Sequence, residues 1–283
     1  MIHVQGLEFG YTRSRKVFRG LGLELGQGSI MGLLGRNGEG KTTLLKLLTG
    51  QLLRQSGQLE VLGHDPKRRQ VSFLQQVYLL PEEVVVPSIS IAKFFEVNGA
   101  FYPSYDAALG HELLQIFSLS PEMNLKKISQ GQKKKALIAF ALALRVPLLL
   151  MDEPTNGLDI PSKSEFRRVL AQYTSEEQTI IISTHQVRDL EQIIDSVLVL
   201  EQGAIICQAT VSEIASRLRF APVQPGEASQ PLYTERSPLG LLGVFARGAD
   251  EEAEDFSMEL FFNALLAARP AVLSALQSQD LIK

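Results

Sequence analysis

Ile128-Ser129-Gln130-Gly131-Gln132, the most informative stretch of this chain, lies shortly before Leu148-Leu149-Leu150-Met151-Asp152-Glu153. The apolar run of the second stretch predicts a buried strand, and its carboxylates follow at the end where open α/β sheets bind ligands. Asp152 could there hold Mg²⁺ through its water shell, and Glu153 could orient and deprotonate an attacking water. Taken alone, Ser129 would be an ordinary helix N-cap, which is the more common role of such a serine.

A glycine-rich loop, Gly35-Arg36-Asn37-Gly38-Glu39-Gly40-Lys41-Thr42, lies between a predicted strand at Ile30–Leu34 and a leucine-rich segment that begins at Thr43. A phosphate-binding loop requires this context. Its glycines let backbone N–H groups approach phosphates, and the N-terminus of the following helix adds favourable partial charge. Lys41 can reach the β- and γ-phosphates, and the Thr42 hydroxyl can ligate Mg²⁺. We therefore expect the chain to bind a nucleoside triphosphate.

Composition excludes several other classes of function. The chain has 283 residues, a net charge of -3 and a pI near 5.9, so charge provides no argument for a nucleic-acid partner. A single cysteine, Cys207, excludes a disulfide framework or a thiolate zinc site. The longest apolar run, Ala136–Leu144, is much shorter than the roughly 20 residues that span a bilayer. Met1–Gln5 shows no secretory signal, so we expect a cytoplasmic chain that reaches a membrane only by docking on another polypeptide.

Strand and helix patterns alternate along most of the chain, which predicts a parallel α/β fold. Residues 87–146 interrupt this alternation and read as an inserted helical subdomain, with Ser88 as a candidate helix cap. The expected strands are Ile2–Phe9, Val17–Leu25, Ile30–Leu34, Gln58–Leu62, Leu148–Met151, Thr179–Ser183 and Val197–Leu200, and the expected helices include Tyr105–Phe117, Pro161–Tyr173 and Val187–Ile194.

The composition changes after Phe220, so we expect a domain of residues 1–220 and an accessory segment of residues 221–283. Ala221–Pro238 is rich in proline and predicts a linker or irregular surface. A possible hairpin (Leu232–Glu235 with Leu241–Ala246) and an acidic cluster at Asp250–Asp255 follow. The apolar helix expected at Met258–Ala268 must bury itself, either on the preceding domain or on a second copy of the chain.

Over residues 1–215 the sequence resembles the ATP-binding subunits of ABC transporters. The phosphate loop, Ser129–Gln132, the strand ending in Asp152-Glu153, Pro154–Asp159 and Ser183-Thr184-His185 occur in the family's order and spacing. The resemblance implies the ABC cassette: a mixed sheet with helices, an antiparallel β subdomain and an inserted helical subdomain. The stretch Phe101–Lys127 looks most like subunits that pair with a separately encoded, export-type permease.

The resemblance also implies a role for individual residues. Ser129, Gly131 and Gln132 would contact the γ-phosphate of ATP held by a second copy or a homologous subunit, with Gln130 in place of the usual glycine. His185 would contact the γ-phosphate and the attacking water, and Asp159 would touch the opposite subunit. Gln76, or alternatively Gln75, would be the glutamine that senses Mg²⁺. Tyr11 is placed to stack on adenine.

Two functions from different classes are therefore considered. The first is an ATPase subunit that closes around two ATP·Mg²⁺, is held on the inner face of the cell membrane by an integral-membrane permease, and powers export. The second is a soluble ABC-type ATPase that acts on ribosomes or DNA. Such proteins usually carry two cassettes or coiled-coil insertions and basic surfaces, whereas this chain has one cassette, no heptads and net negative charge. The transported substrate, the direction of transport and the choice between homodimer and heterodimer stay open.

Overall fold

A six-stranded sheet with the order β5-β6-β7-β3-β8-β9 forms the centre of the computed structural model, which describes residues 1–12, 14–224, 230–238, 240–247 and 256–277. Its strands pair in parallel except at the antiparallel β8–β9 edge. In β3, β6, β7 and β8 nearly every residue is buried, on both faces of the sheet, which explains the nearly continuous apolar sequences of these strands. The strands are β3 (Ile30–Leu34), β5 (Val77–Leu80), β6 (Leu148–Asp152), β7 (Thr179–Thr184), β8 (Ser196–Glu201) and β9 (Ala204–Thr210).

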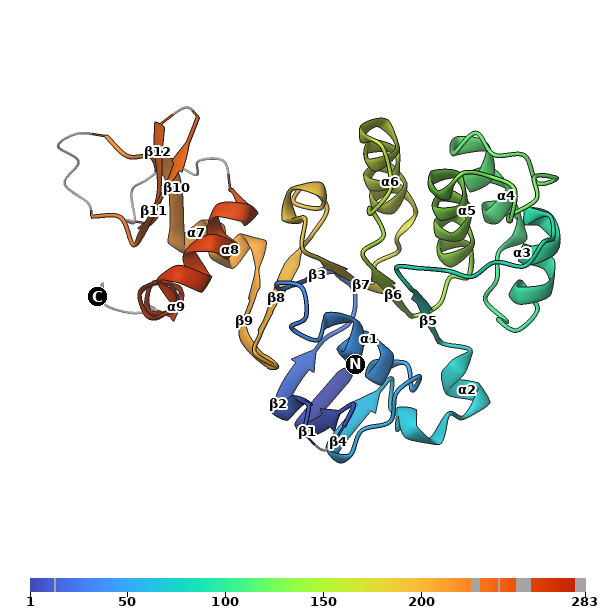
Figure 1. The fold of residues 1–283 in the computed structure, drawn as a ribbon, viewed down its shortest axis with the longest axis horizontal. Coiled ribbons are helices and arrows are strands. Elements are labelled where there is room, and N and C mark those ends of the chain that lie inside the picture. The colour runs from blue at the N-terminus through green and yellow to red at the C-terminus, as the bar shows by residue number, and fades with distance from the viewer. Residues whose placement is uncertain (13, 225–229, 239, 248–255, 278–283) are drawn as a thin grey trace.

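A second, antiparallel sheet has the order β2-β1-β4 and alternates buried with exposed residues, as a half-buried sheet does. Leu44, Leu45 and Leu48 of helix α1 join the core between this sheet and the central one. The strands expected in this region are confirmed, and Figure 1 shows this sheet in blue beside α1. The bounds are β1 (Ile2–Gly10), β2 (Lys16–Leu25), α1 (Lys41–Leu48), β4 (Ser56–Val61), the 3₁₀ turn η1 (Pro66–Arg68) and α2 (Val71–Leu74).

Three helices form the predicted helical part: α3 (Ile91–Gly99), α4 (Ala107–Ile116) and α5 (Gln130–Ala143), at one end of the molecule in Figure 1. The cap of α3 is Ser90 and not Ser88, because the Ser90 hydroxyl accepts the Lys93 N–H at 3.2 Å. The ring of Phe140 on α5 contacts the rings of Tyr78, Phe94, Phe95 and Tyr105, with centroids 5.2–6.1 Å apart. This aromatic cluster joins α5 to α3 and to β5 of the central sheet.

The structure confirms the helix predicted near residues 161–173, which is α6 (Ile160–Tyr173), but the prediction of a helix at Val187–Ile194 is wrong. Only the 3₁₀ turn η2 (Val187–Asp189) forms there, and the next bond joins Ile193 N–H to the Leu190 carbonyl. These backbone bonds span three residues and not four. Val187, Leu190 and Ile194 are all buried, which explains the helical spacing of the sequence without a helix.

The C-terminal part lies at the other end of the molecule in Figure 1 from helices α3 to α5. A three-stranded sheet, β10-β12-β11, packs with three helices, and the β11–β12 hairpin expected from the sequence is confirmed. The boundary expected after residue 220 falls inside β10, so the predicted linker begins within a strand. The elements are α7 (Val211–Arg217), β10 (Leu218–Pro222), β11 (Tyr233–Ser237), β12 (Gly240–Ala246), α8 (Met258–Ala267) and α9 (Arg269–Gln277).

Helix α8 buries its apolar residues within the same chain. Phe261 and Leu265 are fully buried, and Glu259 pairs with Arg188 of η2. The Met258 N–H donates to the Glu191 carboxylate at 2.6 Å. The expected packing on the preceding domain is thus confirmed, while the acidic cluster at 250–255 lies outside the described residues.

Over the described residues, no single helix is long and apolar enough to cross a membrane; the bent α8–α9 pair meets the length and composition test only as a pair.

The Phe140 cluster generates a stability prediction. Phe140 is 1% exposed, and its replacement by alanine would leave a cavity among four aromatic rings. Phe140→Ala should lower the free energy of unfolding by about 3–5 kcal/mol in urea denaturation followed by circular dichroism. Phe101→Ala, at a ring that is 68% exposed, should change it by less than about 0.5 kcal/mol. A cost below about 1 kcal/mol for Phe140→Ala would contradict the cluster's role.

Candidate functional site

The phosphate loop connects β3 to α1 and requires glycine at specific positions. Gly38 and Gly40 have φ of 88° and 106°, in the left-handed region that favours glycine. A Cβ at Gly40 would lie 2.8 Å from Val17 Cγ1, and one at Gly35 would lie 2.6 Å from the Leu200 carbonyl oxygen. The loop is therefore fitted closely against β2 and β8, which leaves its backbone N–H groups at the mouth of a cavity.

Lys41 begins helix α1 and is only 6% exposed. Its ammonium donates to the carbonyls of Gly35 at 2.7 Å and Arg36 at 3.3 Å, and lies 3.8 Å from Glu153 Oε1. Burial lowers the pKa of Lys41, and the carboxylates of Glu153 and Asp152 oppose this effect. In this geometry Lys41 is a preorganised cation for an anionic ligand.

Asp152, at the end of β6, joins the phosphate loop to β7. Its Oδ2 accepts the Thr42 hydroxyl at 2.6 Å, and its Oδ1 accepts the hydroxyl of Ser183. The side chain is 3% exposed, so the charge is held almost entirely by these partners. The two oxygens that the sequence predicts around Mg²⁺, from Thr42 and Asp152, are therefore in direct contact.

Glu153 follows immediately, with a positive φ of 45° that is uncommon outside glycine. Its N–H donates to the Ser183 carbonyl at 3.1 Å, and its Oε1 lies 2.8 Å from His185 Nδ1. Oε2 is buried and has no hydrogen-bond partner among the residues that the structure describes. An unpaired buried carboxylate oxygen beside a lysine and a histidine is suited to receive a proton from a bound ligand or water.

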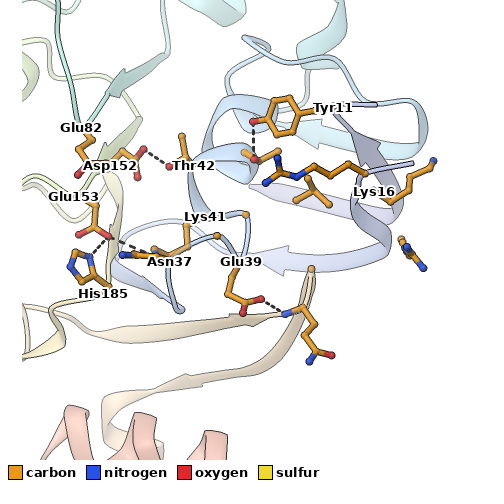
Figure 2. A pocket seen from close by; sticks show the side chains of 18 residues that line it. Tyr11, Lys16, Asn37, Glu39, Lys41, Thr42, Glu82, Asp152, Glu153 and His185 are labelled. Atoms are coloured by element: carbon orange, nitrogen blue, oxygen red, sulfur yellow. Dashed lines mark hydrogen bonds and ion pairs between the residues drawn. The ribbon is translucent and has the colours of Figure 1, made fainter. Parts of the chain in front are cut away.

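A cavity of about 710 Å³ opens in front of these groups (Figure 2). Tyr11 stands at its rim, 55% exposed, with its hydroxyl 3.0 Å from Thr43 Oγ1. The lining residues are Tyr11, Arg15, Lys16, Val17, Arg19, Asn37, Gly38, Glu39, Gly40, Lys41, Thr42, Thr43, Glu82, Asp152, Glu153, His185, Gln202 and Gly203. The structure thus brings together the predicted loop, the carboxylates, His185 and Tyr11, with Gly35 and Arg36 contributing through their carbonyls to Lys41.

The structure does not bring Gln76 or Gln75 to this cavity, which corrects the magnesium-sensing assignment. Both precede β5, at the opposite end of the strand from the phosphate loop, and Gln76 Nε2 donates to the Ser72 carbonyl at 2.7 Å. Glu82 follows β5 at the carboxyl end and lines the cavity beside Asp152 and Glu153, as Figure 2 shows. The apolar run Val77–Leu80 ahead of Glu82 was the sequence signal that would have identified it.

Ser129, Gly131, Gln132 and Asp159 lie outside the cavity too. Ser129 caps α5 by accepting the Gln132 N–H at 3.2 Å, while the Gln132 side chain accepts the Ser129 N–H at 3.1 Å. Asp159 caps α6 through the Ser162 N–H at 2.9 Å, and its hydrogen bonds to Ser162 lower the pKa of Asp159. Both caps are exposed to solvent, so within one chain these residues make ordinary helix caps.

The cavity also has lining residues that were not predicted from the sequence. They are Arg15, Lys16, Arg19, Gln202 and Gly203. The Gln202 N–H donates to Glu39 of the phosphate loop, which joins the β8–β9 turn to the site. These residues belong to no motif of their own.

Comparison with known proteins identifies the class of this site. A model of the family described as ABC transporter matches residues 18–156. The bacitracin transport ATP-binding protein BcrA of Bacillus licheniformis is 32% identical over 213 residues, covering 73% of this chain and 69% of BcrA. The linearmycin resistance ATP-binding protein LnrL of Bacillus subtilis is 26% identical over 229 residues, covering 77% and 72%.

A solved structure has the same fold: a dimeric ATP-binding cassette in a post-hydrolysis state, bound to ADP and Pi, is 17% identical with a TM-score of 0.66 and covers 75% of this chain and 99% of that one. The fold and the phosphate site together define an ATP-hydrolysing cassette. The chain belongs to the ABC transporter family as its ATP-binding subunit.

Proposed function

We propose that this chain supplies half of each of two ATP sites in a dimer that drives an export-type permease. The main observation is that the buried pair Lys41 and Glu153 lies beside the exposed ring of His185 in one chain, while Ser129 lies outside the same cavity. A helix N-terminus offers free N–H groups and positive partial charge to an anion. In the proposed dimer, Ser129 and Gly131 of one copy cover the γ-phosphate held by Lys41 of the other.

The residues at the end of β6 fit Mg²⁺. Hard cations prefer oxygen donors, and the Thr42 hydroxyl and the Asp152 carboxylate are already adjacent, 2.6 Å apart. When bound, Mg²⁺ would neutralise charge on the β- and γ-phosphate oxygens. We assign Thr42 and Asp152 as the Mg²⁺ ligands. We assign Glu82, in place of Gln76, as a further acidic group that faces the ion.

Glu153 is the proposed base. Its free Oε2 accepts the proton of the attacking water, while Oε1 stays bound to His185. His185 keeps the carboxylate oriented and offers its other ring nitrogen toward the γ-phosphate. Lys41 stabilises the charge that develops on the transferred phosphoryl group, so catalysis is largely positioning and electrostatics.

The relatives support an exporter. Their names refer to bacitracin transport and linearmycin resistance, and another relative, 32% identical over 179 residues, is named as an ATP-binding export protein. We infer that the cassette works on the cytoplasmic face of a membrane, docked on a separate permease that selects the substrate. The proposed ATP-binding unit ends near the start of α7, and the C-terminal unit follows it.

The base assignment is tested with Glu153→Gln. This change should lower ATP turnover at least about 100-fold, because amide nitrogen and oxygen accept a proton poorly, while ATP affinity stays within about twofold. Phosphate release and fluorescent-nucleotide binding measure the two quantities. Glu60→Gln, at an exposed carboxylate of β4, is the matched control and should leave both unchanged. Turnover near that of the unchanged protein would remove Glu153 as the base.

The roles of Glu82 and Gln76 are tested as a pair. Glu82→Gln removes one negative charge from the acidic edge, so the Mg²⁺ concentration for half-maximal turnover should rise about threefold or more. Gln76→Ala should leave it unchanged, since the side chain bonds only to Ser72 in the described part of the chain. Magnesium titrations of ATPase rate measure both. The reverse result would restore Gln76 as the magnesium-facing residue.

The composite site is tested with Ser129→Arg. A long cation at this exposed cap should prevent the two copies from closing, while each chain still binds ATP at its own Lys41. Sedimentation in the Glu153→Gln background should show the ATP-dependent dimer lost, with nucleotide affinity within about twofold. Ser212→Arg, at an exposed serine of α7, should leave the dimer intact. A dimer that still forms in Ser129→Arg would refute the cross-subunit contact.

A further inference from the structure

Three consecutive lysines on α5 point to three different partners. Lys133 Nζ lies 3.4 Å from Gln130 Oε1 on the helix surface, and Lys135 pairs with Glu165 of α6 at 2.8 Å. Lys134 turns inward and is only 9% exposed. Successive helical residues are rotated by about 100°, so one of three neighbours can face the core while the others face outward. Lys134 therefore needs a separate explanation.

The ammonium of Lys134 reaches the carboxylate edge of its own ATP site. Nζ donates to the Glu82 carbonyl at 2.7 Å and lies 3.5 Å from the Glu153 carbonyl. One contact holds the segment that leads from β5 to the helical part, and the other holds the residue that ends β6. Lys134 thus bridges the backbone of the proposed base and the backbone of the proposed magnesium-facing carboxylate.

Charge supports the same placement. Burial lowers the pKa of Lys134, and the nearby carboxylates of Glu82, Asp152 and Glu153 oppose this effect. Lys41, a second buried ammonium near these carboxylates, donates to the phosphate loop and also lies 3.8 Å from Glu153 Oε1. A cation at Lys134 reduces the mutual repulsion of three acidic groups that must lie close together before any ligand binds.

We propose that Lys134 is a positioning residue for ATP hydrolysis: it anchors Glu82 and Glu153 through their carbonyls and moderates the negative charge of the magnesium-facing edge. This inference rests on the proposed roles of those two residues. Lys134 is not among the residues that line the cavity; it acts through the carbonyl of Glu153, by holding this residue at the distance and angle that a base requires.

The location of Lys134 gives this anchor a mechanical consequence. Ser129 caps α5, and Lys134 follows five positions later, about 7.5 Å along the helix axis at 1.5 Å per residue. One end of α5 would face the nucleotide of the partner copy, while Lys134 holds the base of its own site. A displacement of α5 on dimer closure is therefore transmitted to Glu153 within two helical turns.

The test uses the full chain with the variants Lys134→Met and Lys134→Arg. The control is Lys93→Met, which removes the same charge from an exposed helix residue. Lys134→Met should lower kcat at least about tenfold, with affinity for mant-ATP in the absence of Mg²⁺ within about twofold. Because a cation is removed from an acidic edge, Mn²⁺ should bind the ATP-loaded variant about threefold more tightly in calorimetry. Lys134→Arg should recover part of kcat with unchanged Mn²⁺ affinity, and Lys93→Met should match the unchanged protein.

The direction in which Mn²⁺ affinity changes distinguishes a positioning role of Lys134 from general disruption of the site. A merely disordered site would bind Mn²⁺ more weakly, so lower kcat with weaker Mn²⁺ binding in both Lys134 variants would overturn the proposal. So would a kcat for Lys134→Met within about twofold of the unchanged protein. If thermal melting shows that Lys134→Met does not fold, Lys134→Gln takes its place. Glutamine retains an N–H donor without charge, so tighter Mn²⁺ binding is again expected, together with a lower kcat than that of Lys134→Arg.

Failure of this inference and failure of the proposed function give different results. If Glu153→Gln retains turnover, the proposed base is wrong and Lys134 has no base to position. If Glu153→Gln abolishes turnover but Lys134→Met turns over ATP as fast as the unchanged protein, the proposed function stands and only the role of Lys134 is refuted.

Discussion

The contact between Thr42 and the carboxylate of Asp152 is the interaction on which the rest of the site depends. Asp152 is nearly inaccessible and accepts from Thr42 on α1 and from Ser183 on β7, so one charge joins a helix and two strands. A buried carboxylate requires such partners, because an unpaired charge in this environment is costly. The same contact that satisfies Asp152 also fixes the phosphate loop against the carboxyl edge of the sheet.

The apolar strands make this contact possible. β6 and β7 are buried throughout and pair in parallel, with Asp152 in register with Ser183. The next residue, Glu153, can leave the strand only through a left-handed backbone, held by its N–H bond to Ser183. Residues in such conformations cluster at functional sites, where the surrounding structure maintains them. The direction of the Glu153 side chain toward His185 is thus a consequence of strand pairing.

Local patterns were sufficient for most of the fold. The phosphate loop, β6 and the helix after Ser129 each carry a motif whose residues are adjacent in the chain, and the structure has all three. Glu82 was missed because the short apolar run Val77–Leu80 was not recognised as a strand; the pairing of β5 beside β6 brings the carboxylate to the site. The helix expected at Val187–Ile194 does not form, although the sequence has apolar residues at helical spacing. Single turns of backbone are enough to bury these residues. The burial of Lys134 has no local sequence signal, because its ammonium donates to the carbonyl of Glu82, which lies 52 positions away along the chain.

Within one chain, the residues of the cavity and the two exposed helix caps lie apart. Lys41, Glu153 and His185 converge on a cavity, yet the exposed caps at Ser129 and Asp159 point into solvent and satisfy only their own helices. Glu259 of α8 meanwhile pairs with Arg188, three positions after His185, and Arg269 of α9 pairs with Glu201 beside the β8–β9 turn of the cavity. The C-terminal unit therefore rests on the segments that hold the ATP site, on the side of the chain opposite α5. On the other side, Lys134 of α5 approaches the carbonyl of Glu153, so the end of β6 is held from α5 while the C-terminal helices hold η2 and the β8–β9 turn.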